Sequence, residues 1–375
     1  MNLRPALGLT VVALLLTPVA RSGHELPVYP SYYPHEIEIA ALEPREAGAL
    51  LASGKLHAYV GGVPSFGGAL PKDIASAPSL GSWLIVKLNP NSPLASEEIS
   101  ACAVVGAVMR ELEGKGSDVV AHPYPVTPLH GDYLHHVDLA EAAKARLGGA
   151  AADGLKLRAE SALAQSLVRP EWRAEGHDWD AVIQEIDAGR LVASAMMVTN
   201  GWIGPRWVRS GWFHAHRVLA EWMDPHLKER VEAGVARLQI SDIVSAAERA
   251  NLERDLVRHL TTGCRAMVAG YTLRREYFNA TFSAGIENIA YDALEGFGSP
   301  MFVRTVKLKD FPWNGWLQLG VGQLPVAAWS PIGGFTDDFG RLMWFAMGDT
   351  ATIPSPYDHG WVLNRISEVE ASPRK

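Results

Sequence analysis

Residues 36–60, EIEIAALEPREAGALLASGKLHAYV, decide the expected fold class. The first six residues alternate between polar and apolar side chains, which is the pattern of a half-buried strand. Pro44 then begins a helical pattern that ends before Gly54, as helix start and stop signals favour. Leu56–Val60 is a second apolar strand. Two strands joined by one helix and short loops predict a parallel, right-handed β-α-β unit.

The alternation of strands and helices continues along the chain to residue 138. We expect a strand at Trp83–Leu88, a helix over about Ser96–Glu113 and a short strand at Val119–Ala121. Residues 36–138 are therefore predicted to form one α/β domain.

A large helical region, residues 139–300, is predicted to follow. Residues 148–154 are small and flexible in character, so we expect two lobes to meet near residues 139–154. The longest pattern runs from Ser241 to about Leu294, and Gly263 and Gly270 are the expected points of division within it. The other predicted helices are Leu139–Leu147, Leu155–Leu167, Trp179–Ala188, Gly211–Trp222 and Pro225–Leu238.

The last part of the chain, residues 301–375, is predicted to be β-rich and to pack on the body. Met301–Leu308 and Trp316–Val321 flank an Asn-Gly pair at residues 314–315, which favours a hairpin. A second hairpin is expected to turn at residues 337–340, before Arg341–Met347. The expected fold class is mixed α/β, with an N-terminal parallel βαβ domain, a large helical middle and C-terminal β-hairpins.

The N-terminus predicts export. Residues 1–22 have a positive Arg4, an apolar run and a small-x-small sequence at Ala20–Ser22, which together are typical of a signal peptide. Residues 23–35 are rich in Pro and Tyr and are expected to form an extended arm. We therefore expect a periplasmic or extracellular protein that makes no stable membrane insertion once the signal is cleaved.

The net charge limits the class of binding partner, and the cysteine content limits the possible disulfides. The formal net charge of −7, without a run of Lys or Arg, argues against nucleic acid or an anionic membrane as a partner. The expected partner is a small-molecule ligand. Cys102 and Cys264 are the two cysteines. In an oxidising compartment they form either one disulfide or two separate buried thiols, and the sequence leaves both alternatives open.

The stretch Asp118–Asp138, DVVAHPYPVTPLHGDYLHHVD, holds four of the 13 histidines. A short strand leads into three prolines, which predict a rigid loop before a helix. Imidazole and carboxylate side chains suit a divalent transition metal such as Zn, Fe or Cu. The alternative is that Asp132 caps the following helix and the histidines serve only structure. The candidate metal ligands are His122, His130, Asp132, His135, His136, His214 and His216.

Tryptophan and arginine are interleaved in residues 200–217, NGWIGPRWVRSGWFHAHR. Three tryptophans recur every five residues, a spacing that fits neither a helix face nor a strand face. Indole and guanidinium groups together suit an anionic or ring-shaped ligand, although tryptophans that fill an interface between lobes are the alternative. The candidate ligand-binding residues are Trp202, Arg206, Trp207, Arg209 and Trp212.

Three functions are compatible with these patterns. The first is an exported solute-binding protein that holds a small polar or anionic ligand between two lobes; the order of elements is similar to that of periplasmic binding proteins. The second is an exported metalloenzyme, a hydrolase or an oxidoreductase, built on the His/Asp cluster. The third is a non-catalytic envelope assembly or interaction factor. No motif identifies a catalytic residue.

Overall fold

The structure, a computed structural model, describes residues 34–147, 154–174, 176–198, 205–311, 315–324, 338–347, 352–355, 358 and 360–363. The predicted signal peptide, most of the predicted arm and residues 148–153 of the predicted hinge lie outside these ranges. The strands are β1 (Glu36–Ala41), β2 (Ala58–Val60), β3 (Ile74–Leu88), β4 (Val119–Ala121), β5 (Leu157–Ala159), β6 (Ala181–Asp187), β7 (Ala266–Asn279), β8 (Ile286–Glu287), β9 (Lys307–Leu308), β10 (Trp316–Val321), β11 (Thr352–Pro354) and β12 (Trp361–Leu363). The α-helices are α2 (Pro44–Ala52), α3 (Glu98–Leu112), α4 (Val137–Arg146), α5 (Ala162–Leu167), α6 (Ala188–Val198), α7 (Gly211–Leu219), α8 (Pro225–Ile240), α9 (Ala246–Leu260), α10 (Pro300–Thr305) and α11 (Asp338–Met347).

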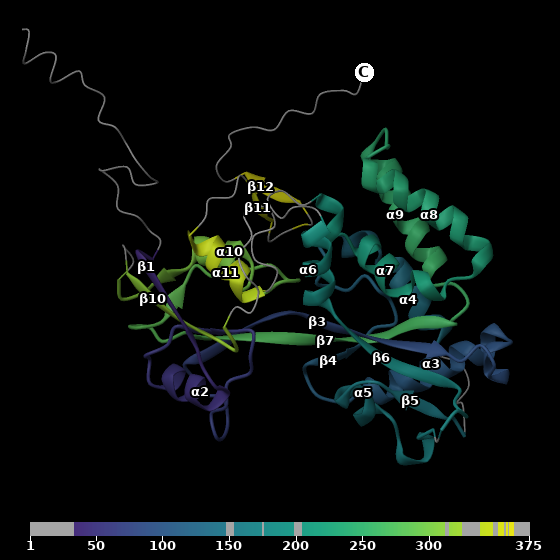
Figure 1. The fold of residues 1–375 in the computed structure, drawn as a ribbon, viewed down its shortest axis with the longest axis horizontal. Coiled ribbons are helices and arrows are strands. Elements are labelled where there is room, and N and C mark those ends of the chain that lie inside the picture. Colours follow the sequence, from purple (N-terminus) through teal and green to yellow (C-terminus); the bar gives the residue numbers. More distant parts are fainter. Residues whose placement is uncertain are drawn as a thin grey trace, which may run out of the picture.

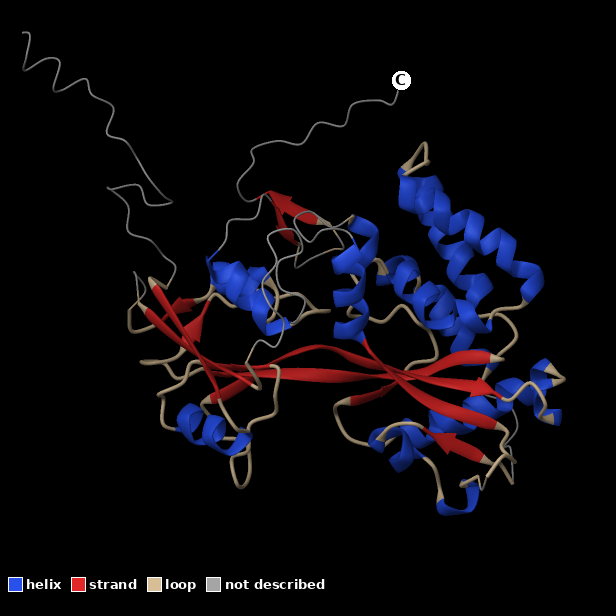
Figure 2. Ribbon diagram, viewed as in Figure 1, coloured by secondary structure: helices blue, strands red, loops and turns tan. Residues whose placement is uncertain are grey.

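One mixed sheet runs through the molecule in the order β1-β10-β2-β7-β3-β6-β5, and β4 pairs with β7 beside β2. The two long strands β3 and β7 are antiparallel and cross most of the width of the molecule (Figure 1). Helices cover both faces of the sheet (Figure 2). The mixed α/β class is therefore confirmed.

The first β-α-β unit has the predicted elements and the predicted strand direction. β1 and β2 are parallel, but β10 lies between them and pairs with both. The strand that completes the unit thus comes from the far end of the chain. Because β10 lies between β1 and β2, these two strands are not hydrogen-bonded to each other.

Several helical predictions are wrong because the residues are strands. The segment 181–187 has Ala181 and Ile183 buried and pairs with β3 along its whole length. The predicted helix over residues 241–294 ends at Leu260, and Gly263 and Cys264 follow with positive φ angles of 83° and 52°. Residues 266–279 then form β7, which is rich in β-branched and aromatic side chains. Residues 157–159 are likewise the strand β5 rather than helix.

The predicted C-terminal hairpins are also wrong. Residues 300–305 form α10, which has Pro300 at its first position and Ser299 as a cap that accepts from the Met301 amide. β9 pairs with β8, and β10 pairs with β1 and β2, so the two expected hairpin strands have other partners. Residues 338–347 form α11 instead of a strand. The predicted domain boundaries stay predictions.

The apolar core is divided between the two ends of the sheet. One cluster joins β3, β6 and β7 to α3 and to the helices α7–α9, with Trp83 and Trp212 completely buried. Two smaller clusters pack α2, β2, β10 and α10 at the other end. A disulfide between Cys102 of α3 and Cys264 ties α3 to the start of β7. Among the described residues, no helix has both the length and the apolar character needed to cross a membrane.

Candidate functional site

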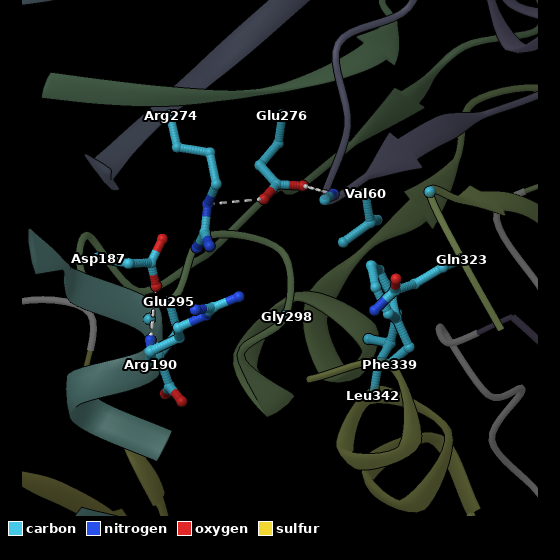
Figure 3. A pocket seen from close by; sticks show the side chains of 13 residues that line it. Val60, Asp187, Arg190, Arg274, Glu276, Glu295, Gly298, Gln323, Phe339 and Leu342 are labelled. Carbon is cyan, nitrogen blue, oxygen red and sulfur yellow. Dashed lines mark hydrogen bonds and ion pairs between the residues drawn. The ribbon is translucent and has the colours of Figure 1, made fainter. Parts of the chain in front are cut away.

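A polar cavity of about 390 Å³ lies beside the middle of β7 (Figure 3). The parallel strands β2 and β10 end at its edge, where open sheets commonly bind ligands. The opposite wall is the start of α6, and α11 covers a third side. Its lining residues are Val60, Gly61, Asp187, Gly189, Arg190, Arg274, Glu276, Glu295, Gly298, Gly322, Gln323, Phe339 and Leu342. The cavity is thus built from segments that lie far apart in the sequence.

Gly61 shapes the edge of this cavity. Its φ angle is 73°, a conformation that L-residues with a Cβ rarely adopt. A Cβ atom there would lie 2.6 Å from the Phe339 ring, so the aromatic side chain packs directly on the glycine backbone. The Gly61 amide donates to Glu276 Oε2 at 3.2 Å, which holds the end of β2 against β7.

Two arginines project toward the cavity from different elements. Arg274 of β7 donates through Nε to Ser79 Oγ at 3.3 Å, and the same nitrogen lies 3.4 Å from Glu276 Oε1. The two terminal nitrogens of Arg274 have no partner among the described residues. Arg190 is exposed, and its guanidinium group likewise makes no bond within the described ranges. Two guanidinium groups with available N–H donors suit a carboxylate or phosphate group.

Three acidic side chains share the cavity wall with the two arginines. Asp187 Oδ1 accepts from the backbone amide of Arg190 at 2.7 Å and so caps the start of α6. Glu276 is buried, 1% exposed, and interacts with Arg274 and the Gly61 amide. Glu295 lies half-buried on the wall. The cavity is therefore polar on several sides, which fits a small polar ligand.

The His-rich loop forms a second polar cluster, away from this cavity. The Trp83 indole donates to the Pro125 carbonyl at 3.0 Å, which ties the proline-rich loop to β3. His130 lies beside His214 of α7, with a distance of 2.9 Å between His130 Nε2 and His214 Nδ1. The structure therefore brings one candidate ligand of the loop into contact with one of α7.

The hydrogen bonds determine the tautomers of both rings. The Thr127 amide donates to His130 Nδ1, so His130 carries its proton on Nε2 and donates it to His214 Nδ1. His214 then carries its proton on Nε2 and donates to the Val208 carbonyl at 2.9 Å. Burial lowers the pKa of His130 and lowers that of His214 to about 4, so both rings are neutral at pH 7. Each of the four ring nitrogens of the pair takes part in a hydrogen bond, either as donor or as acceptor.

Asp132 caps a helix, but not the helix that follows it. Its Oδ2 accepts from the Gly211 amide at 2.8 Å, at the first position of α7, and it makes no cap bond to the turn at residues 133–135. A carboxylate at a helix N-terminus is favoured by the helix dipole. Asp132 thus caps a helix that begins 79 residues further along the sequence.

The remaining predicted metal ligands do not converge. His136 is buried and its Nδ1 lies 2.9 Å from the Tyr124 hydroxyl oxygen, whereas His135 is exposed. His122 Nε2 donates to the Val126 carbonyl, and His216 lies 3.2 Å from Glu232. Burial lowers the pKa of His122, and lowers that of His136 to about 4. Within the part of the chain that the structure describes, no group of three His, Cys, Asp or Glu residues could hold a metal ion. A metal site stays a prediction from the sequence.

The Trp/Arg segment contributes to packing and to a buried ion pair. Trp212 is fully buried, and Trp207 packs on Phe213 with ring centroids 4.9 Å apart. Arg209 forms an ion pair with Asp292. Trp202 and the Arg206 side chain lie outside the described parts of the chain. The described members of the set, Trp207, Arg209 and Trp212, therefore do not line the cavity of Figure 3.

Sequence reasoning missed Arg190, Arg274 and Glu276. Arg274 and Glu276 lie in a segment that was expected to be helical, where alternate residues would not share a face. In the strand β7 they do share a face, and the alternation Arg274–Glu276 was the one available signal. Arg190 lies in the first turn of α6, directly after β6. The sequence predicted a helix that ended at Ala188, so Arg190 fell outside every predicted element.

No protein-family model matches the sequence, and a comparison with curated proteins gives no match. Solved structures give weak similarities. A periplasmic murein tripeptide binding protein, MppA, has a TM-score of 0.40 at 10% identity over 70% of this chain and 55% of that chain. The oligopeptide-binding protein AppA from Bacillus subtilis has a TM-score of 0.38 at 11% identity, covering 71% and 59%. A nickel ABC transporter from Bacillus halodurans has a TM-score of 0.42 at 10% identity, covering 67% and 58%. The chain spans less than two thirds of the length of each.

Proposed function

We propose that the chain is an exported solute-binding protein that holds a small polar or anionic ligand in the cavity of Figure 3. The observation that carries the proposal is the pair of guanidinium groups, Arg190 and Arg274, on the cavity wall. Each has N–H donors without a partner among the described residues. A ligand carboxylate or phosphate would accept from these donors, and charged hydrogen bonds of this kind are the strong ones.

The size and position of the cavity support this proposal. A volume of about 390 Å³ is in the range of small-molecule sites, which is roughly 300–1,000 Å³. Its walls come from β2, β10 and α11 at one end of the sheet and from α6 at the other, while β7 runs along both. A ligand held there contacts both ends, as a ligand between two lobes does. Export is proposed from the N-terminal sequence.

A binding panel tests this function. Succinate, citrate and inorganic phosphate, with glycerol and putrescine as neutral and cationic comparisons, are titrated into the purified mature protein by calorimetry and by thermal unfolding. At least one anion is expected to bind and to raise the melting temperature, because a ligand that binds only the folded state stabilises it. A protein that binds putrescine or glycerol but none of the anions contradicts the anionic ligand.

Arginine variants locate the site. Arg190→Gln and Arg274→Gln each remove a charged donor, and a hydrogen bond to a charged group contributes about 1.5–3 kcal/mol. We therefore expect each variant to weaken anion binding about 10- to 100-fold. Arg217→Gln is the matched control, since Arg217 is exposed on α7 and does not line the cavity. Equal loss of affinity in the control, or none in the two test variants, refutes the assignment.

A further inference from the structure

A second cavity, of about 300 Å³, lies between the His-rich loop and the loop that follows β8. It shares no lining residue with the cavity of Figure 3. The His-rich loop contributes Pro128, Leu129 and Leu134 together with His130 and Tyr133, and the other loop contributes Leu294. Arg209 is the cation on the wall among the described residues.

Arg209 is a buried cation with unused donors. Its side chain is 5% exposed and forms an ion pair with Asp292, which is 2% exposed. The Arg209 Nη2 atom also donates to the Ser355 carbonyl at 3.5 Å. The Nε and Nη1 atoms have no hydrogen-bond acceptor among the described residues. A buried donor left without an acceptor costs about 1–3 kcal/mol, and native proteins leave few of them.

The charges around Arg209 select the kind of acceptor that fits. Asp292 forms an ion pair with the guanidinium group, so this buried pair is neutral as a whole. An anionic ligand would therefore bring an uncompensated charge beside a buried neutral pair, which costs free energy. An ammonium group has only donors and no lone pair to offer the Arg209 N–H groups. An uncharged carbonyl oxygen accepts hydrogen bonds without adding charge.

We propose that this cavity binds a small uncharged ligand with an apolar body and a carbonyl oxygen, of the amide or ester class, whose oxygen accepts from Arg209. The apolar side chains Leu129, Leu134 and Leu294 surround the body of the ligand. The volume of about 300 Å³ holds a ligand of about ten water-sized groups, at the ~30 Å³ that a water molecule occupies in the liquid. This site is independent of the anionic ligand proposed above.

A matched series of ligands tests the chemical class. Hexanamide, hexanoate and hexylammonium share one apolar chain and differ in whether the head group is a neutral acceptor, an anion or a cation. Each is titrated into the full-length mature protein by ligand-observed NMR and calorimetry. Hexanamide is expected to bind saturably and at least about tenfold more tightly than the other two, a difference of about 1.4 kcal/mol. Equal or tighter binding of hexanoate or hexylammonium overturns the proposal, and so does the absence of hexanamide binding.

Two variants test the location. Arg209→Lys keeps the positive charge near Asp292 but removes the guanidinium donors, and it should abolish the preference for hexanamide. Ala293→Leu leaves every charge in place and narrows the cavity, so hexanamide binding should fall at least about tenfold while the circular dichroism spectrum and the melting temperature are retained. Arg217→Gln, which lies outside both cavities, serves as the control. Unchanged hexanamide binding in a folded Ala293→Leu variant places the ligand elsewhere and overturns the assignment.

Discussion

The buried histidine pair predicts a specific loss of stability at low pH. His214 is 0% exposed and accepts from His130 while donating to Val208, so its neutral form is required by the structure. In the unfolded chain an imidazole has its ordinary pKa of 6.5, whereas burial lowers the pKa of His214 to about 4 in the fold. Between these values the unfolded chain binds a proton that the folded protein does not.

The sign and size of the effect follow from this difference. Stability is fully present above pH 6.5 and falls as the pH drops, because protonation favours the unfolded chain. Each pH unit in the interval costs about 1.4 kcal/mol, so His214 alone removes about 3 kcal/mol between pH 6.5 and pH 4. That is a large part of the 5–15 kcal/mol typical of folded proteins. The hydrogen bond to the Val208 carbonyl opposes this lowering of the His214 pKa, and the charge of Arg209 adds to it.

Urea unfolding at a series of pH values measures this loss. The variant His214→Gln cannot take up a proton in this range, so its stability should fall less steeply than that of the native protein, by about 1.4 kcal/mol per pH unit. His177→Gln is the control, because His177 is exposed and lies outside the hydrogen-bonded chain of Thr127, His130, His214 and Val208. Identical slopes for the native protein and His214→Gln between pH 6.5 and pH 4 would refute the tautomer chain.

Two further predictions concern stability at neutral pH. Removing the disulfide with Cys102→Ala, alone or together with Cys264→Ala, should lower the free energy of unfolding by about 5 kcal/mol in the chain-entropy model, because the bridged residues are 162 positions apart. Denaturant unfolding measures this loss, and variants as stable as the native protein would contradict it. Asp132→Ala should cost about 1–2 kcal/mol by removing the cap of α7, and Asp132→Asn, which keeps an acceptor, should cost less; equal melting temperatures of Asp132→Ala and the native protein would argue against the cap.

Local sequence patterns were sufficient to predict several helices and strands. Pro44 and the alternation of residues 36–41 predicted β1 and α2, and the apolar periodicity of residues 98–112 predicted α3. The prolines after Val119–Ala121 predicted a loop, and residues 122–132 contain no helix or strand. These features depend on side chains a few residues apart, so the sequence alone determines them.

Only the tertiary structure decided the sheet order and the site. An apolar run such as residues 266–271 fits a buried helix or a buried strand, and β3 as a pairing partner makes it a strand. Likewise, β10 separates β1 from β2 because pairing across hundreds of residues depends on shape and register, which no local pattern encodes. Arg190 and Arg274 meet at one cavity for the same reason: each is placed by its own element, and the packing of those elements is a property of the whole fold.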